Sequence, residues 1–483
     1  MERGLSVLTL AGTHPCLHFS FVDREELMKR VYKFALLLVL LSLYQRSLLA
    51  QNSFALTGTI VTARGIVNEG TIIVENGRIR DIGANLQVPA GMPLVKVDGV
   101  IFPGLIDLHD HLAWNVLPRW TLPNPVTTRY EWQAMPEYAA HLARPERELM
   151  FRGEGCDMER YAEVKALLGG ATSVTGSYSA GAADDTKNSC LKGSVRKLDV
   201  YSGFYPQSSA EPLLYEVFPL EMSWQQAQAI REKLGSREIK AVICHVGEGK
   251  DASAKREFSM FAARGFLRPG VSIVHGVALN EPEFRRMTVN GVGFVWSPRS
   301  NFELYGKTAD VESAKAAQVT IALAPDWSPT GSDGMLDELR YAHKWSSDRP
   351  KPVFSNFEFF QMVTSNPARL AAVSDKTGSL APEMAADLIV LPRIGDDPLQ
   401  ALVSSDPASI KLVVVGGHAL LGTLEYMRQL HPGKELELVT ICNQQKVLDV
   451  REDIGDSFSA IEGRLRNALQ SLGTTLAPLS ECR

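Results

Sequence analysis

The sequence predicts an α/β protein whose main domain is a (β/α)8 barrel, with a small β-sandwich domain formed by both ends of the chain. Between residues 103 and 375, apolar strands alternate with helical stretches, which is typical of βαβ units in a parallel sheet. Short segments rich in Thr, Ile and Val flank this region on both sides. Several central strands end in His or Asp, as expected at the C-terminal face of a barrel.

The spacing of the central strands leaves alternatives open. The second predicted strand, 171–176, and the fourth, near 213–220, lie close together in the sequence, so a distorted barrel is one alternative. A doubly wound open sheet is another. No Gly-x-Gly-x-x-Gly follows a strand, so nothing supports dinucleotide binding.

Length, composition and charge limit the number of domains and the classes of function. The chain has 483 residues, which exceeds one average domain and indicates a large and a smaller one. Its composition, 45% hydrophobic and 22% charged, is that of an ordinary globular protein. A formal net charge of −5 and the lack of a long basic run argue against nucleic-acid binding. The predicted units are a presequence (1–50), the β-sandwich (54–102 with 376–435), the barrel (103–375) and a C-terminal helical extension (436–483).

The first fifty residues predict a secretory signal. Residues 28–33 are basic and 34–43 are apolar without charge, and this run is shorter than the roughly 20 residues that span a bilayer. Met28 is an alternative start, and a buried core helix is the structural alternative. We expect an exported protein, periplasmic or extracellular, without stable membrane insertion after the signal is removed.

Cysteine usage is compatible with export. Cys16 would leave with the presequence, and Cys244 lies in an apolar strand as a buried thiol. Four further cysteines allow three disulfide connectivities, which an oxidising compartment would permit. They are Cys156, Cys190, Cys442 and Cys482.

A His-x-His pair follows the first apolar strand of the barrel region. Residues 100–108 are apolar and run into His109-Asp110-His111. On a strand, residues i and i+2 point to one face, so both imidazoles are expected in the barrel mouth. A polar strand end is the structural alternative.

Three more strands end in residues of the same kind. Strand 241–244 is followed by His245 and Glu248, strand 271–274 by His275, and strand 319–324 by Pro325 and Asp326. Three imidazoles and one carboxylate suit Zn²⁺, with Fe²⁺ as the alternative. A bound ion can lower the pKa of water to about 7 and supply a nucleophile at neutral pH. Asp326 and His275 are then candidates to accept the proton, and Glu248 to protonate a leaving group or ring nitrogen.

These motifs resemble those of the amidohydrolase superfamily over about residues 54–420. The best resemblance is to the mononuclear branch that includes cytosine deaminase, guanine deaminase and triazine chlorohydrolases. The segments that carry it are Gly-Val-Ile-Phe-Pro-Gly-Leu-Ile-Asp-Leu-His-Asp-His (99–111), His245-Val-Gly-Glu248, His275, Ser-Pro-Arg-Ser-Asn (297–301), Ala-Pro-Asp (324–326), Asn-Pro-Ala-Arg (366–369) and Gly-Ser-Leu-Ala-Pro (378–382).

The resemblance implies a metal site and catalytic residues. It assigns His109, His111, His245 and Asp326 as metal ligands, with Glu248 and His275 catalytic. Binuclear members carry a bridging lysine on the fourth strand, but residues 198–232 contain no Lys, which indicates a single metal ion.

The function expected from this resemblance is hydrolysis of a carbon–nitrogen bond that is not a peptide bond, favouring deamination of an aminated heterocycle. One alternative is an amidohydrolase or chlorohydrolase that cleaves an amide C–N or a C–Cl bond. A second is a catalytically silent exported relative that binds a ligand. The expected partner is a small-molecule substrate; a homo-oligomer is compatible with the sequence.

Substrate contacts are expected from two segments. The long connection 112–149 holds several aromatic residues, Trp114 among them, and is a candidate cap over the site or a lid packed for structural reasons. Arg299 and Asn301 are candidates to contact the substrate. Apolar residues at helical spacing in 458–472 predict an amphipathic helix that packs on the body.

Overall fold

The computed structural model describes residues 33–34, 53–177, 193–200, 204 and 213–482. Residues 1–51 form one compact unit and residues 52–483 another. Apart from residues 33–34, the predicted secretory signal lies outside the described residues, as do Met28, Cys16 and Cys190. Among the helices that are described, none combines the length and apolar character needed to cross a bilayer.

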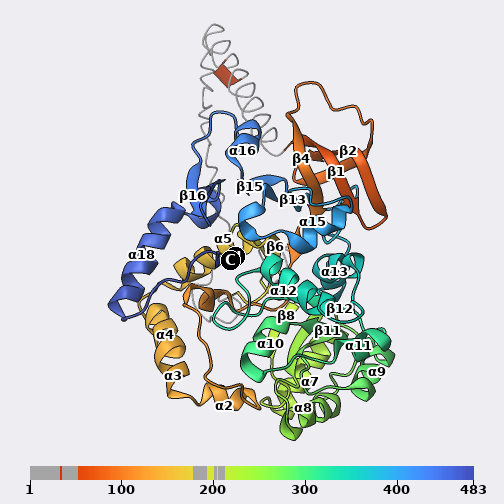
Figure 1. The fold of residues 1–483 in the computed structure, drawn as a ribbon, viewed down its shortest axis with the longest axis vertical. Coiled ribbons are helices and arrows are strands. Elements are labelled where there is room, and N and C mark those ends of the chain that lie inside the picture. Colours follow the sequence, from red (N-terminus) through yellow and green to blue (C-terminus); the bar gives the residue numbers. More distant parts are fainter. Residues whose placement is uncertain (1–32, 35–52, 178–192, 201–203, 205–212, 483) are drawn as a thin grey trace, which may run out of the picture. The chain divides into compact units, whose positions relative to one another are not determined.

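A nine-stranded mixed sheet is assembled from both ends of the second unit, as the sequence predicted (Figure 1). Its two halves meet where β4 pairs antiparallel with β13, with Pro103 opposite Leu388. The strands from the first half are β1 (Phe54–Thr62), β2 (Gly65–Glu75), β3 (Arg78–Ala84) and β4 (Leu94–Pro103). Those from the second half are β13 (Leu388–Leu391), β14 (Leu412–Val415), β15 (His418–Gly422), β16 (Glu437–Ile441) and β17 (Gln444–Leu448).

The turn between β2 and β3 shows why the local sequence forms this sheet. Asn76 and Gly77 both have positive φ, +53° and +76°, which is the backbone of a type I′ hairpin turn. Leu56, Ile72 and Val74 are fully buried in the core of the sheet. Their burial holds the register, because a shift of one residue would turn every apolar side chain outward.

Eight parallel strands follow in chain order between the two halves. They form a three-stranded sheet, β5 to β7, and a five-stranded sheet, β8 to β12. The described residues therefore show two parallel sheets and no closed barrel. The strands are β5 (Leu105–Ile106), β6 (Ala171–Val174), β7 (Arg196–Lys197), β8 (Leu213–Val217), β9 (Ala241–Val246), β10 (Val271–His275), β11 (Gly293–Trp296) and β12 (Ile321–Leu323).

Helices connect the parallel strands, because each strand must cross over to begin again at the same end of the sheet. Figure 1 shows α7 to α11 grouped around the five-stranded sheet. These crossovers are α7 (Trp224–Gly235), α8 (Ala252–Ala263), α9 (Glu281–Val289), α10 (Pro298–Tyr305) and α11 (Val311–Ala316). After β12 come α12 (Met335–Ser347), α13 (Asn356–Val363), α14 (Ser365–Leu370) and α15 (Pro398–Ser404).

The stretch 100–108, predicted as one strand, is divided between two sheets. Residues up to Pro103 belong to β4, whereas Leu105 and Ile106 form β5. At Gly104 an added Cβ would lie 2.1 Å from Thr172 Oγ1, so only glycine allows this close passage. His109 and His111 consequently follow the strand instead of lying on it, which corrects the prediction that both project from one strand face.

The connection between β5 and β6 is compact and partly helical. Its elements are η1 (Leu112–Val116), α2 (Arg129–Gln133), α3 (Pro136–Tyr138), η2 (Ala139–Ala143), α4 (Arg144–Phe151) and α5 (Gly155–Leu168). Trp120 and Trp132 are buried within it, with ring centroids 6.4 Å apart. This connection is joined to the loop after β9, where Lys250 N donates to Thr127 O at 2.8 Å.

The region 436–483 is only partly helical. It begins with β16 and β17, which extend the nine-stranded sheet, and then forms α17 (Arg451–Ile454) and α18 (Phe458–Ser471). The expected amphipathic helix is α18, which packs on α5 through stacked rings of Phe458 and Tyr161. The strands were not expected there; in Glu437–Ile441, Val439 and Ile441 are buried, whereas Leu438 and Thr440 are exposed.

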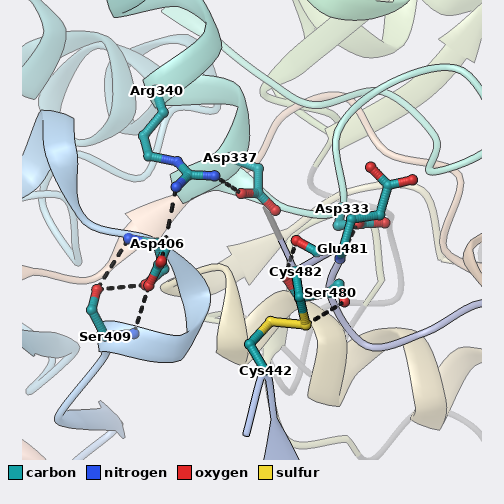
Figure 2. The surroundings of a disulfide bond; sticks show 9 residues. All are labelled: Asp333, Asp337, Arg340, Asp406, Ser409, Cys442, Ser480, Glu481 and Cys482. Carbon is teal, nitrogen blue, oxygen red and sulfur yellow. Dashed lines mark hydrogen bonds and ion pairs between the residues drawn. A yellow bond between two sulfur atoms is a disulfide. The ribbon is translucent and has the colours of Figure 1, made fainter. Parts of the chain in front are cut away.

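A disulfide ties the hairpin β16–β17 to the segment that follows α18. Cys442 lies at the hairpin turn and bonds to Cys482, which is exposed (Figure 2). Cys156 is also disulfide-bonded. Cys244 is a buried free thiol, as predicted.

Candidate active site

The strand-end residues singled out in the sequence converge on one point. His109 follows β5, His245 lies in β9, His275 ends β10, and Asp326 follows β12. Two groups each have all ligand atoms within 4.8 Å of one another, and His109 is common to both. The groups are His109, His245 and His275, and His109, His111 and Asp326.

The spacing of these atoms matches that of metal ligands. Nε2 of His109 is 3.2 Å from Nε2 of His245, and both His109 and His111 place Nε2 3.5 Å from Asp326 Oδ1. Two ligands held about 2.0–2.1 Å from a tetrahedral ion are about 3.3 Å apart. The donor set therefore fits a zinc-like cation.

The protonation states of these residues also suit a metal. Burial, followed by the neighbouring imidazoles, lowers the pKa of His109 and of His245 well below the usual value. Both rings are therefore neutral at physiological pH, with a lone pair available. Burial raises the pKa of Asp326, which a nearby cation would counteract.

Supporting residues orient two of the rings. Nδ1 of His109 is 2.8 Å from Ser297 Oγ, and Nδ1 of His275 is 3.1 Å from Asn301 Oδ1. With Nδ1 engaged, Nε2 of each ring faces the centre, as is usual for residues next to a metal. Asn301, predicted to contact substrate, thus supports His275 in this structure.

The backbone is strained at two of the converging residues. His275 has φ +67° and Asp326 has φ +65°, in the left-handed region that non-glycine residues rarely adopt. Asp326 is held there by its N–H, which donates to His109 O at 2.9 Å. Such outliers cluster at functional sites, where the surrounding structure compensates for the strain.

Glu248 lies beside the His/Asp cluster in a hydrogen-bonded network. Tyr305 donates its hydroxyl to Glu248 Oε1 at 2.7 Å, and His275 Nε2 is 3.7 Å from Oε2. Arg129 Nη1 is 3.9 Å from Oε2 of the same carboxylate and 2.9 Å from Glu257 Oε1. Sequence reasoning missed Tyr305 and Arg129, because neither belongs to a motif and both reach Glu248 from distant elements.

A cavity of about 170 Å³ lies over these groups. It is lined on one side by polar residues of the cluster and on the other by aromatic rings. Trp114, predicted to contact the substrate, is in its wall and stacks on Tyr138 with an interplanar angle of 10°. Arg299 is not among its lining residues; its guanidinium faces Glu481 instead. The lining residues are His111, Trp114, Trp132, Gln133, Tyr138, Phe218, His245, Glu248, His275, Leu304, Asp326 and Trp327.

Comparison with known proteins finds similar sequences over much of the chain. A family model described as the amidohydrolase family matches residues 232–420. A 5'-deoxyadenosine deaminase of Methanosarcina mazei is 22% identical, over 86% of this chain and 98% of its own length.

Solved structures share the fold. An adenosine deaminase of Xanthomonas campestris with bound zinc has a TM-score of 0.66 at 17% identity, covering 87% of this chain and 98% of that one. An atrazine chlorohydrolase of Arthrobacter aurescens complexed with zinc has a TM-score of 0.61 at 18% identity, covering 76% and 95%. The chain is therefore similar to the amidohydrolase family over residues 232–420, and to a deaminase over most of its length.

Proposed function

We propose that this protein is a metal-dependent deaminase of an aminated heterocycle. The observation that carries the proposal is Glu248, which shares an aromatic-walled cavity with the His/Asp cluster and lies within 3.7 Å of His275. Deamination of a ring needs an acid that can protonate a ring nitrogen beside the carbon under attack. The 5'-deoxyadenosine and adenosine deaminases among its relatives support the same reaction class.

The metal ligands in this proposal are His109, His111, His245 and Asp326. Zinc is favoured because neutral imidazoles and one carboxylate suit it, and zinc is bound in two of the similar structures; Fe²⁺ is the alternative. When bound, such an ion polarises water and lowers its pKa toward neutrality.

The chain's own groups then divide the proton transfers. His275 and Asp326, which interact electrostatically and each of which groups with His109, accept the proton of the attacking water. Glu248 donates a proton to the ring nitrogen, and the hydrogen bond from Tyr305 fixes the position of its carboxyl group. The amino group leaves as ammonia once the accepted proton is passed to it, and the remaining hydroxyl proton returns to Glu248 as the ring carbonyl forms.

The cavity wall favours a flat, ring-sized substrate. Trp114, Trp132 and Trp327 line it, and aromatic faces stack well on heterocycles. Its volume of about 170 Å³ is below the roughly 300–1,000 Å³ of typical ligand pockets. We infer that the reacting ring, and not a large substituent, occupies the space beside Glu248.

We also propose that the two parallel sheets are arcs of one distorted (β/α)8 barrel. Their eight strands succeed one another in chain order, and a parallel bridge between Asp110 and Asp326 links the first strand to the last. Export to an oxidising compartment remains our proposal for localisation. The Cys442–Cys482 disulfide supports it, since such bonds persist mainly outside the cytosol.

An assay of released products tests the proposed reaction. The zinc-loaded protein is incubated with amino-purines, amino-pyrimidines and chlorinated or aminated triazines, and ammonia and chloride are measured. We expect ammonia from at least one aminated ring, with activity lost on chelation and restored by Zn²⁺. Chloride without ammonia would favour the alternative that the chlorohydrolase relative suggests. Zinc-loaded protein that releases neither product would contradict both reactions.

A further inference from the structure

The segment that follows α18, residues 472–482, is fixed on the body of the protein by several independent contacts. We call it the tail segment. Ala477 N donates to Val116 O at 2.9 Å, and Tyr161 donates its hydroxyl to Ala477 O at 2.6 Å. Cys482 closes the segment onto the β16–β17 hairpin through its disulfide with Cys442 (Figure 2). These contacts give residue 481, next to the disulfide, a defined position.

Glu481 lies between two arginines that come from different parts of the chain. Its Oε1 is 3.3 Å from Arg119 Nε and its Oε2 is 3.2 Å from Arg299 Nη2. Its backbone N–H donates to Asp333 Oδ2 at 2.9 Å. Asp333 is held in turn by buried Lys165, whose Nζ is 2.8 Å from Oδ1. Backbone and side chain of Glu481 are therefore both engaged.

The first arginine, Arg119, forms hydrogen bonds to the loop that begins at Asp326. Arg119 Nη1 donates to the carbonyl oxygens of Ser328 at 3.2 Å and Gly331 at 2.7 Å. This loop carries Asp326 in its left-handed conformation and Trp327 in the cavity wall. Because a strained backbone persists only when its surroundings hold it, the anchoring of this loop matters for the position of Asp326.

The second arginine belongs to α10, the helix that supports two of the histidines. Arg299 lies between Ser297, which contacts His109, and Asn301, which contacts His275. Glu481 thus joins both segments that position the cluster, the Asp326 loop and α10.

Charge makes Glu481 necessary at this point. Burial, followed by the charge of Arg299, lowers the pKa of Arg119, and Glu481 opposes this shift. Without this carboxylate the two guanidinium groups would repel each other, and Arg119 would keep Glu303, whose Oε1 is 3.8 Å from its Nη2. Loss of one partner from a buried ion pair is usually strongly unfavourable, because the remaining charge stays desolvated.

We propose that Glu481, held by the Cys442–Cys482 disulfide, is a positioning residue that keeps the Asp326 loop and α10 in the arrangement the metal site needs. A dithiol reductant that reaches exposed Cys482 would cleave the Sγ–Sγ bond. Two electrons and two protons pass to the cysteines, giving two thiols, while the reductant becomes a disulfide. The part of the tail segment beyond Ala477 would then lose its covalent anchor, so the position of Glu481 would depend on an oxidising environment. This inference rests on the proposed function.

The test compares E481Q with C442S/C482S and with E435Q as the matched control, since Glu435 is an exposed glutamate outside these contacts. Serine variants are used in place of a reductant because they leave the disulfide of Cys156 intact. We measure hydrogen–deuterium exchange of peptides spanning 326–333, the rate of zinc loss to a chelator, and kcat and KM for ammonia release.

We expect E481Q to raise exchange in 326–333, to speed zinc loss about tenfold, and to lower kcat about tenfold with a smaller change in KM. C442S/C482S should act in the same direction, and its combination with E481Q should match the larger single effect, because both act through one contact. E435Q should behave as the wild type. Wild-type exchange and zinc loss in E481Q would overturn the proposal, even if C442S/C482S does not fold.

Failure of the proposed function gives a different pattern. If the wild type releases no ammonia from any substrate, the exchange of 326–333 still decides whether Glu481 anchors the loop. An E481Q variant with altered exchange and zinc loss would then support the anchoring while the deaminase assignment fails.

Discussion

Among the residues that the structure describes, two clusters of His and Asp side chains occur, and one of them has the character of a metal site. The first comprises His109, His111, His245 and Asp326 beside the cavity. The second comprises His418, His431 and Asp449, at the beginning of β15, after α16 (Leu424–Leu430) and after β17. Each cluster contains at least one group of three residues whose ligand atoms lie within 4.8 Å of one another, so proximity alone does not separate them.

The partners of the two clusters differ. In the second, Lys434 Nζ lies 2.8 Å and 2.9 Å from the two oxygens of Asp449, and His431 Nε2 donates to Ala419 O at 2.8 Å. Lys434 therefore neutralises the negative charge of Asp449. Nε2 of His431 donates to a carbonyl oxygen and so offers no lone pair to a metal ion. In the first cluster, no lysine or arginine of the described residues forms an ion pair with Asp326.

This difference indicates what a metal site requires beyond suitable residue types. Nitrogen lone pairs must face a common point, and the carboxylate must lack a protein cation that already neutralises it. The second cluster is a complete hydrogen-bonded network that ties β15, α16 and β17 together. The ligand atoms of the first cluster, in contrast, need a bound cation to complete their interactions.

The largest effect is expected from a substitution at the centre of the first cluster. H109A should remove the bound zinc and lower kcat/KM by about 10³-fold or more, because His109 is the ligand common to both groups of metal-ligating residues. H418A should keep the zinc content and activity of the wild type. Metal analysis of the purified proteins, together with the ammonia assay, measures both. Zinc lost from H418A and retained in H109A would reverse the assignment.

The next prediction separates metal binding from acid catalysis within the first cluster. E248Q keeps the shape of the side chain but removes its exchangeable acid, so we expect kcat to fall by about 10²- to 10⁴-fold with zinc retained. The exposed residue Glu281 provides the control, E281Q, which should leave kcat unchanged. Full activity in E248Q would contradict the role of Glu248.

A smaller effect is expected from a substitution of Tyr305, which contacts Glu248. Y305F removes the hydroxyl that donates to Glu248 at 2.7 Å and accepts from Trp132 Nε1 at 3.0 Å. Since a hydrogen bond to a carboxylate contributes about 1.5–3 kcal/mol, we expect kcat to fall about tenfold or more, with zinc content unchanged. Steady-state kinetics of Y305F and of the control Y341F measure this. An unchanged kcat in Y305F would mean that Glu248 holds its position without the hydroxyl.

The smallest effect on activity is expected in the second cluster, where a change should affect stability alone. Burial acts to raise the pKa of Asp449, but hydrogen bonds from His418 and Lys434 outweigh it and lower the pKa to about 2. A depressed folded-state pKa stabilises the protein above the unfolded value near 4, and this contribution disappears as pH falls toward 2. D449N should therefore lose about 2 kcal/mol of unfolding free energy at pH 7 and less in acid.

Denaturant unfolding of D449N and wild type at several pH values checks this prediction. The two curves should approach each other between pH 4 and pH 2, while ammonia release at pH 7 stays at the wild-type level. A difference that is constant with pH would show that packing, and not the charge of Asp449, accounts for the loss.

The sequence predicted those features of the site that a local pattern of residues encodes. The apolar strands ending in His245, His275 and Asp326 were predicted, and these side chains do meet. It was uninformative where the outcome depends on distant partners. Neither Tyr305 nor Arg129 stands out in the chain, since each reaches Glu248 only after folding.

Two differences between the sequence prediction and the structure have the same origin. The stretch 100–108 reads as one apolar strand because both sheets bury their strands, and only the close approach of Thr172 to Gly104 divides it. Arg299 follows a motif near the site, yet its side chain turns to Glu481, a residue far along the chain. Periodicity and motifs carry no information about such pairings.

The pairing of β4 with β13 has a consequence for synthesis of the chain. Pro103 meets Leu388, so the nine-stranded sheet cannot be completed until roughly 285 further residues have been made. At about 5–20 residues per second, β4 waits about 15 to 60 s with one hydrogen-bonding edge open. An open edge is a template for pairing with other chains. A nascent or truncated chain that ends before β13 is therefore the form of this protein that most needs a chaperone.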